Sequence, residues 1–154
     1  SGPMVSPEIF HQLIYPYYCI VGDAAHSSDM HFWLHSCGDN TLLLPDLIES
    51  GVDVFHPVQK HTMDEVEIMA QFGGKITFLA GIDVQHVLQE ADPDTVRREV
   101  RFLIDTFDRT EGRMCIAAGN GIVGGTPIEN IEAFLDEAVR YGAAHRNGAI
   151  RRES

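Results

Sequence analysis

The sequence predicts an α/β protein built around a parallel sheet. Four short apolar segments, each long enough for a strand, alternate with four longer helical segments, and one more helical segment precedes them. The repeat of about 25 to 40 residues is typical of a (β/α)8 barrel, which needs roughly 250 residues for eight units. We therefore expect about four βα units, a half-barrel, over residues 1–145, followed by a polar, basic tail over residues 146–154.

The composition is that of one globular domain. Hydrophobic residues make up 44% of the 154 residues, and no apolar run reaches the length of a membrane span. Three widely spaced cysteines do not make a disulfide framework, and no signal peptide opens the chain, so we expect a cytoplasmic protein that binds no membrane. The net charge of −12, with no Lys or Arg before Lys60, argues against a nucleic-acid partner.

The first expected element is a helix. Ser6 is a good N-cap, and Pro7 suits the first helical position. Apolar residues at helical spacing continue to about Ala25. Pro16 falls inside this stretch, so we expect one kinked helix.

The four expected strands are short and apolar. We place them near residues 30–35, 52–56, 76–81 and 114–118. The first is apolar from Met30 to Leu34 apart from His31, which is typical of a strand covered on both faces.

Each strand is followed by a helix with a recognisable start or end. The spacing of Thr62 and Glu65, and of Thr126 and Glu129, is that of a capping box. Asp92 precedes a proline and starts a helix with an apolar stripe. The expected ranges are 42–50, 62–72, 92–107 and 126–141.

Polar side chains follow all four strands. Residues two apart in an extended backbone point to one side, so His35 and Cys37 project together and offer half of a zinc site. Four more candidates follow the other strands, namely His56, Gln59, Asp83 and Asn120. Because barrel chemistry takes place at the carboxyl ends of strands, we expect the two histidines and the cysteine as metal ligands and the other three as catalytic residues.

Each candidate also has a purely structural explanation. His56 can satisfy a backbone carbonyl, Asp83 can cap the next turn, and Asn120 between two glycines can tolerate a left-handed backbone. His35 and Cys37 can be a buried histidine and a small apolar cysteine. Polar groups at four successive strand ends are harder to explain in this way, so we favour a functional site.

Five segments resemble the carboxyl-terminal half of the uroporphyrinogen decarboxylase family. They are SPEIFHQLIYPYY (6–18), FWLHSCGDN (32–40), LLLPDLIESGVDVFHPVQ (42–59), KITFLAGIDVQ (75–85) and GTPIENIEAF (125–134). The family includes zinc-dependent, corrinoid-linked methyltransferases that move methyl groups to thiols. The resemblance implies a barrel whose amino-terminal half is not in this chain.

Two branches of that family differ at the strand ends. The methyltransferase branch has His-x-Cys at the position of His35 and Cys37 and a further cysteine at the position of Asn120. The decarboxylases have Gly-His-Gly where Asn120 stands between glycines, and their substrate-binding arginines and catalytic aspartate belong to the amino-terminal half. The resemblance therefore favours the methyltransferase-like branch, with a weak zinc site that lacks its third ligand.

The resemblance implies three possible functions for a small-molecule substrate. The one we favour is zinc-assisted methyl transfer to a thiol, with the corrinoid on a partner protein, because the sequence shows no corrinoid-binding signature. The second is cofactor-free decarboxylation of the acetate side chains of uroporphyrinogen. The third is an inactive barrel fragment that serves as a binding or assembly unit.

The half-barrel also predicts a partner. Four strands alone would expose two sheet edges and an open core. We therefore expect either a homo-oligomer or the missing amino-terminal half to complete the barrel.

Overall fold

The computed structural model of the protein describes residues 2–109 and 113–146 and contains one four-stranded sheet in the order β1-β2-β3-β4. All three neighbouring pairs are parallel, as the alternation of elements predicted. The strands are β1 Trp33–His35, β2 Val54–His56, β3 Thr77–Ile82 and β4 Met114–Ala118. The helices are α1 Pro7–Leu13, α2 Tyr15–Ser27, α3 Leu44–Glu49, α4 Glu65–Phe72, α5 Pro93–Phe107 and α6 Ile128–Arg146.

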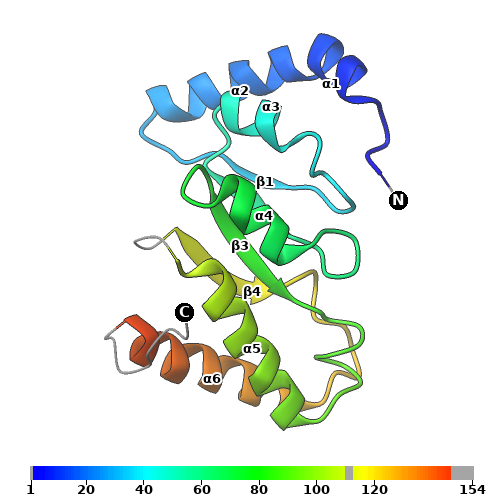
Figure 1. Ribbon diagram of the computed structural model, residues 1–154, viewed down its shortest axis with the longest axis vertical. Coiled ribbons are helices and arrows are strands. Elements are labelled where there is room, and N and C mark those ends of the chain that lie inside the picture. Colours follow the sequence, from blue (N-terminus) through cyan, green and yellow to red (C-terminus); the bar gives the residue numbers. More distant parts are fainter. Residues whose placement is uncertain (1, 110–112, 147–154) are drawn as a thin grey trace.

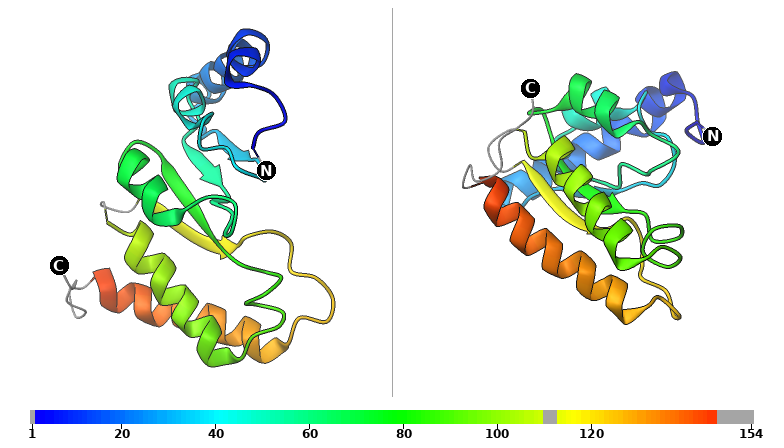
Figure 2. Two further views of the ribbon diagram at one scale, coloured as in Figure 1. Left: turned by 45° about the vertical axis from the view of Figure 1, so that its right-hand side comes forward. Right: turned by 60° about the horizontal axis from the view of Figure 1, so that its bottom comes forward.

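The strands follow one another along the long axis of the molecule (Figure 1). The helices α1 to α3 lie at one end of this axis, and α5 and α6 lie at the other. The loops after β3 and β4 leave the sheet on the same side (Figure 2), as parallel strands require. This arrangement gathers the segments that follow the strands at one edge of the sheet.

The expected kinked first helix is wrong, because the segment forms two helices. The helix is interrupted at Ile14, which is the last cap residue of α1 and the first of α2, with φ −114° and ψ −47°. Pro16 lies in the first turn of α2, where the missing N–H of a proline costs no intrahelical bond. The predicted start is confirmed, since the Ser6 hydroxyl accepts a hydrogen bond from the Ile9 N–H at 3.3 Å.

The later helices differ from the prediction mainly at their ends. The Asp92 carboxylate caps α5 as expected, accepting from the Thr95 N–H at 2.7 Å. The capping box at Thr62 is wrong, because Asp64 caps α4 and the Thr62 hydroxyl donates to the Gln59 carbonyl. Helix α6 continues past its expected end near residue 141, and the rest of the predicted tail, 147–154, lies outside the described residues.

One face of the sheet packs on the helices and contains the core. The residues that point to this face are aligned across the four strands, namely Leu34, Phe55, Phe78 and Met114. The Phe55 and Phe78 side chains are almost fully buried. Alternate residues point to the other face, where Trp33 and His35 are exposed and Leu79 is only partly covered. This open face corresponds to the interior of a complete barrel.

The expectation that the first strand is covered on both faces is therefore wrong. Strand β1 forms one edge of the sheet, and Trp33 is 57% exposed. Met30, expected within the strand, precedes it and is also exposed. An apolar run alone cannot show whether the second covering layer belongs to the same chain.

An aspartate ties the entry of the sheet to the end of α2. Asp53 Oδ2 accepts hydrogen bonds from the Phe32 N–H and from His26 Nε2, both at 2.8 Å. Burial opposes the charge of this carboxylate, but the two hydrogen bonds outweigh it and hold the pKa of Asp53 below its usual value.

None of the helices within the described residues combines the length and apolar character needed to cross a membrane.

Candidate active site at the carboxyl ends of the strands

The ends of β1 and β2 bring two histidines and a cysteine into contact. His35 and His56 are paired in the register of the two strands, so their side chains project to the same open face. Their Nδ1 atoms lie 2.8 Å apart. The other ring nitrogen of His35, Nε2, lies 3.2 Å from the Cys37 Sγ. The structure thus brings all three predicted metal ligands together.

A backbone carbonyl at one end determines the direction of the hydrogen bonds in this group. His56 Nε2 lies 3.2 Å from the Ala118 carbonyl oxygen, which can only accept, so Nε2 carries the proton. In neutral His56, Nδ1 must then accept from the His35 Nδ1–H. His35 Nε2 is left as an acceptor, facing the Cys37 thiol.

Burial favours this neutral form of His56. Desolvation lowers the pKa of His56, and the neighbouring His35 lowers it further, while the bond to the Ala118 carbonyl opposes the shift. The structural explanation considered for His56, that it satisfies a carbonyl, therefore holds together with its contact to His35.

The loop that carries Cys37 is held by a residue that the sequence reasoning missed. Asn40 is 5% exposed, and its Nδ2 donates to the carbonyls of Ser36, Cys37 and Gly38 at 2.9 to 3.3 Å. From the loop after β2, Gln59 Oε1 accepts from the Gly38 N–H at 2.9 Å. A short amide side chain after a glycine is a recognisable loop signal, and it could have indicated this role.

The His35 and Cys37 atoms fit two positions of a zinc site. Tetrahedral zinc ligands at about 2.0 Å (nitrogen) and 2.3 Å (sulfur) are about 3.5 Å apart, close to the observed 3.2 Å between Nε2 and Sγ. His56 contacts the opposite nitrogen of the His35 ring, so an ion between Nε2 and Sγ would not reach it. His56 is instead placed as the outer hydrogen-bond partner that metal-binding histidines commonly have.

Asn120 approaches the same sulfur from the end of β4. Its Nδ2 lies 3.9 Å from the Cys37 Sγ, while its Oδ1 accepts from the Gly121 N–H. An amide N–H donates and cannot bind a metal, but it can stabilise a thiolate. Its backbone is not among the described residues with positive φ, so the left-handed explanation does not apply.

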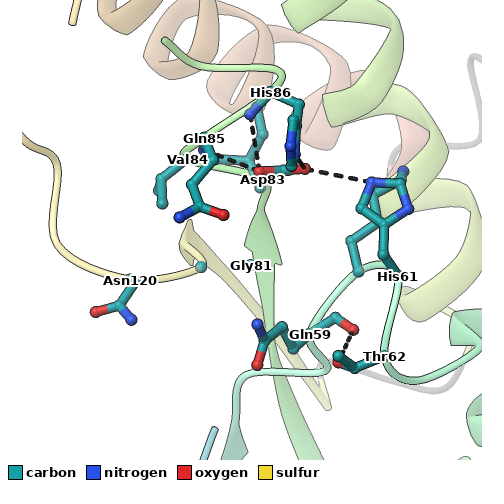
Figure 3. A pocket seen from close by; sticks show the side chains of 12 residues that line it. Gln59, His61, Thr62, Gly81, Asp83, Val84, Gln85, His86 and Asn120 are labelled. Carbon is teal, nitrogen blue, oxygen red and sulfur yellow. Dashed lines mark hydrogen bonds and ion pairs between the residues drawn. The ribbon is translucent and has the colours of Figure 1, made fainter. Parts of the chain in front are cut away.

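A second group of side chains borders a cavity of about 230 Å³ beside this site (Figure 3). Asp83 Oδ2 lies 2.9 Å from His86 Nδ1 and 3.4 Å from His61 Nε2, and the two histidines approach it from different sides. We call these three residues the His61–Asp83–His86 cluster. Gln59 and Asn120 line the same cavity, so three of the predicted catalytic residues share it.

Asp83 also caps the turn after β3, as its structural explanation proposed. Its Oδ1 accepts from the backbone N–H groups of Gln85 and His86 at 2.8 and 3.1 Å. Burial opposes the charge, but the bonds from His86 and from the backbone hold the pKa of Asp83 below its usual value. His61 and His86 carry no recognisable signal in the sequence, because both lie in loops without periodic patterns.

Two glycines form the floor of the cavity. A Cβ atom on Gly81 would lie 2.4 Å from the Gly119 Cα, and one on Gly119 would lie 2.9 Å from the Ile82 carbonyl oxygen. Both distances are shorter than real Cβ contacts, so β3 and β4 can approach this closely only with glycine at both positions.

The fold and these strand-end residues define a half-barrel of the (β/α)8 class with a histidine–thiol site on its interior face. Residues 1–141 match the profile of the family described as uroporphyrinogen decarboxylase (URO-D). The chain belongs to this family.

Relatives with two different activities are similar to the chain. It is 27% identical over 145 residues to a methylated-thiol–coenzyme M methyltransferase of Methanosarcina mazei, a match covering 88% of this chain and 34% of the relative. It is 32% identical over 108 residues to a uroporphyrinogen decarboxylase of Paraburkholderia phytofirmans, covering 70% of this chain and 28% of the relative. The chain thus spans about a third of the length of these relatives.

A solved structure supports the fold. A methyltransferase from Methanosarcina mazei superposes with a TM-score of 0.72 at 19% identity, covering 89% of this chain and 38% of the other. At this identity the likeness shows the fold alone. The choice between methyl transfer and decarboxylation therefore depends on the residues of the site.

Proposed function

We propose that this chain forms the carboxyl-terminal part of a methyltransferase-like member of the family, one that transfers a methyl group to a thiol. The observation that carries the proposal is the 3.2 Å contact between His35 Nε2 and the Sγ of the exposed Cys37. His56 holds the His35 ring through the opposite ring nitrogen, Nδ1. A histidine and a cysteine at this spacing are two zinc ligands on the open face.

The chain's own residues prepare this site. The Cys37 S–H proton can pass to His35 Nε2, which leaves a thiolate on sulfur and a proton on each nitrogen of the His35 ring. His56 Nδ1 accepts from the His35 Nδ1–H and so stabilises the charged ring. The Asn120 amide donates toward the thiolate.

Zinc, when bound, supplies charge that keeps an acceptor thiol deprotonated at neutral pH. His35 Nε2, after it has released the Cys37 proton to solvent, and Cys37 Sγ would hold the ion, and Gln59 would keep the Cys37 loop in position through Gly38. A corrinoid on a partner protein is the methyl donor that we propose.

Decarboxylation of a tetrapyrrole is the alternative, supported by the 32% identity to a decarboxylase. A substrate with many carboxylates needs cations around it. Lys60 is the one lysine or arginine among the described residues that line the cavity, and its Nζ is already paired with the Glu99 carboxylate. This pairing favours methyl transfer.

The test combines metal content with activity. The purified chain should contain or take up zinc at His35 and Cys37 and should then demethylate methylcobalamin in the presence of a thiol. Cys37→Ser should abolish the demethylation and lower the zinc content by the one ion that His35 and Cys37 hold. Cys115→Ser, which removes another free cysteine of the open face, should change neither.

Other outcomes would favour the alternatives. Demethylation at an equal rate in Cys37→Ser would contradict the proposal. Tight binding of a porphyrinogen without any metal requirement would support decarboxylation, and the absence of both activities would support a binding or assembly role.

A further inference from the structure

The His61–Asp83–His86 cluster has the composition of a metal site and lies apart from His35 and Cys37. One ligand atom from each of the three residues lies within 4.8 Å of the other two. Within residues 2–109 and 113–146 this is the one group of three or more such side chains that meets this condition.

Two separate segments orient the histidines toward the carboxylate. His86 is three residues after Asp83, in the turn that the Asp83 Oδ1 stabilises through two backbone N–H groups. His61 lies in the loop after β2 and has a φ of +67°, in the left-handed region that favours glycine. Their rings are nearly perpendicular, at 88°, with centroids 5.7 Å apart.

The burial of the three side chains suits a site at the mouth of a cavity. The Asp83 side chain is 9% exposed, whereas those of His61 and His86 are 65% and 63% exposed. A buried carboxylate gives a fixed negative charge, and the accessible imidazoles can exchange a proton for a cation. Both histidines point a nitrogen at the same oxygen, Asp83 Oδ2, which accepts from their N–H groups (Figure 3). A cation that replaces these two protons would meet both nitrogens and the carboxylate oxygen in one region.

We propose that His61, Asp83 and His86 bind a divalent first-row transition ion. Two imidazoles and one carboxylate form a donor set that such ions accept, with the remaining coordination positions open. These positions face the cavity that Gln59 and Asn120 also line, where an oxygen ligand such as water or a carboxylate can complete the coordination. This site does not depend on the proposed methyl transfer, because it shares no ligand with His35 and Cys37.

A background without the Cys37 thiol separates the two sites. In Cys37→Ser, titration with Co²⁺ followed by calorimetry and visible absorption should still show one ion bound per chain. Its d–d bands should appear without a thiolate charge-transfer band, since the cluster contains no sulfur. In the unmodified chain the charge-transfer band should report the other site.

The ligands are tested on that background. His86→Ala should weaken Co²⁺ binding by at least about tenfold, because losing even an outer partner of a metal ligand costs that much. His61→Gln, which keeps a polar side chain at an exposed position, should do the same if His86→Ala does not fold. His31→Ala is the matched control, since His31 and His26 also flank an aspartate, Asp53, but their ligand atoms are too widely spaced.

Two results would overturn the proposal. One is the absence of Co²⁺ binding in folded Cys37→Ser. The other is an equal loss of affinity in His31→Ala and in the cluster variants, which would indicate unspecific binding to surface histidines. Failure of the methyl-transfer proposal would appear instead as a missing thiolate band in the unmodified chain.

Discussion

The hydrogen bonds from the Cys37 thiol to the Ala118 carbonyl form a directed chain of four groups. The carbonyl can only accept, so the protons of His56 and His35 are assigned in turn, and a basic nitrogen faces the sulfur. The same chain keeps His56 from acting as a ligand while both of its nitrogens are engaged. The positions of the protons on His56 and His35 therefore depend on the Ala118 carbonyl oxygen, a backbone atom of β4.

Asn120 is the position at which the proposed zinc site can be tested most directly. Asn120→Cys would place a third ligand beside Cys37, since the Asn120 amide already lies 3.9 Å from the sulfur. We expect zinc affinity, measured by competition with a chelating dye, to increase by orders of magnitude. Adding Cys37→Ser should reverse the gain. Unchanged affinity in a folded Asn120→Cys protein would contradict a metal site here.

Part of this site follows from the sequence by geometry alone. The spacing of His35 and Cys37 and the alignment of parallel strand ends predict their contact and the nearby positions of His56 and Asn120. Asn40, His61 and His86 were not predicted, because loop backbones have no period from which a side-chain direction can be deduced. Their roles depend on turns that only the folded chain shows.

At the scale of the elements, Asp53 connects three of them through one carboxylate. The carboxylate accepts hydrogen bonds from the Phe32 N–H, at the entry of β1, and from the His26 side chain, at the end of α2. Asp53 itself belongs to the segment that enters β2. It also continues the sheet, since its carbonyl accepts from the Thr77 N–H. We expect this junction to be a main contribution to the stability of the first half of the sheet.

The contribution of Asp53 should depend on pH. Because the folded-state pKa of Asp53 is lowered, its stabilisation is present above the unfolded value of about 3.9 and is lost as the pH falls through the folded value. Asp53→Asn should lower the free energy of unfolding by about 1 kcal/mol at neutral pH, a figure discounted for partial exposure. Urea unfolding of both proteins should show this difference begin to shrink below about pH 4 and disappear once the pH is below the folded-state pKa of Asp53. A difference that stays constant from neutral pH down to the most acidic pH at which the protein folds would mean that the charge is not its source.

Most elements could be predicted because their signals are local. Asp92 and Pro93 start α5, and alternating apolar segments specify the parallel strands. The break at Ile14 was missed because a proline predicts a disturbance of a helix but not whether the two parts stay coaxial. The exposure of Trp33 was missed because an apolar run predicts a covered strand, whereas nothing within the described residues covers Trp33 on the open face.

At the scale of the whole molecule, the half-barrel has an open face and two free edges. Within the part of the chain that the structure describes, strands β1 and β4 each have a paired strand on one side alone, and Trp33 is exposed on the face that would line a barrel. Free edges and an apolar inner face favour association with another sheet. The relatives, which are about three times as long, have additional chain that could fill this position.

We predict that this chain does not remain a monomer in isolation. The simplest partner is a second copy, so light scattering at micromolar concentration should give a mass of at least two chains. Trp33→Lys, which adds a charge to the open face, should shift the equilibrium toward one chain. Pro45→Lys, on an exposed part of α3, serves as the control and should not. A stable monomer for the unmodified chain would contradict the prediction.

The close contact of Gly81 and Gly119 has a consequence for engineering this protein. Neither position can acquire a side chain without separating β3 from β4, so mutation cannot introduce new chemistry into the floor of the cavity. Variation on this side of the rim is confined to residues that follow the strands, such as Asp83, His86 and Asn120. A library randomised at those three positions would sample new ligands and substrates while leaving the glycine contact that joins the two strands untouched.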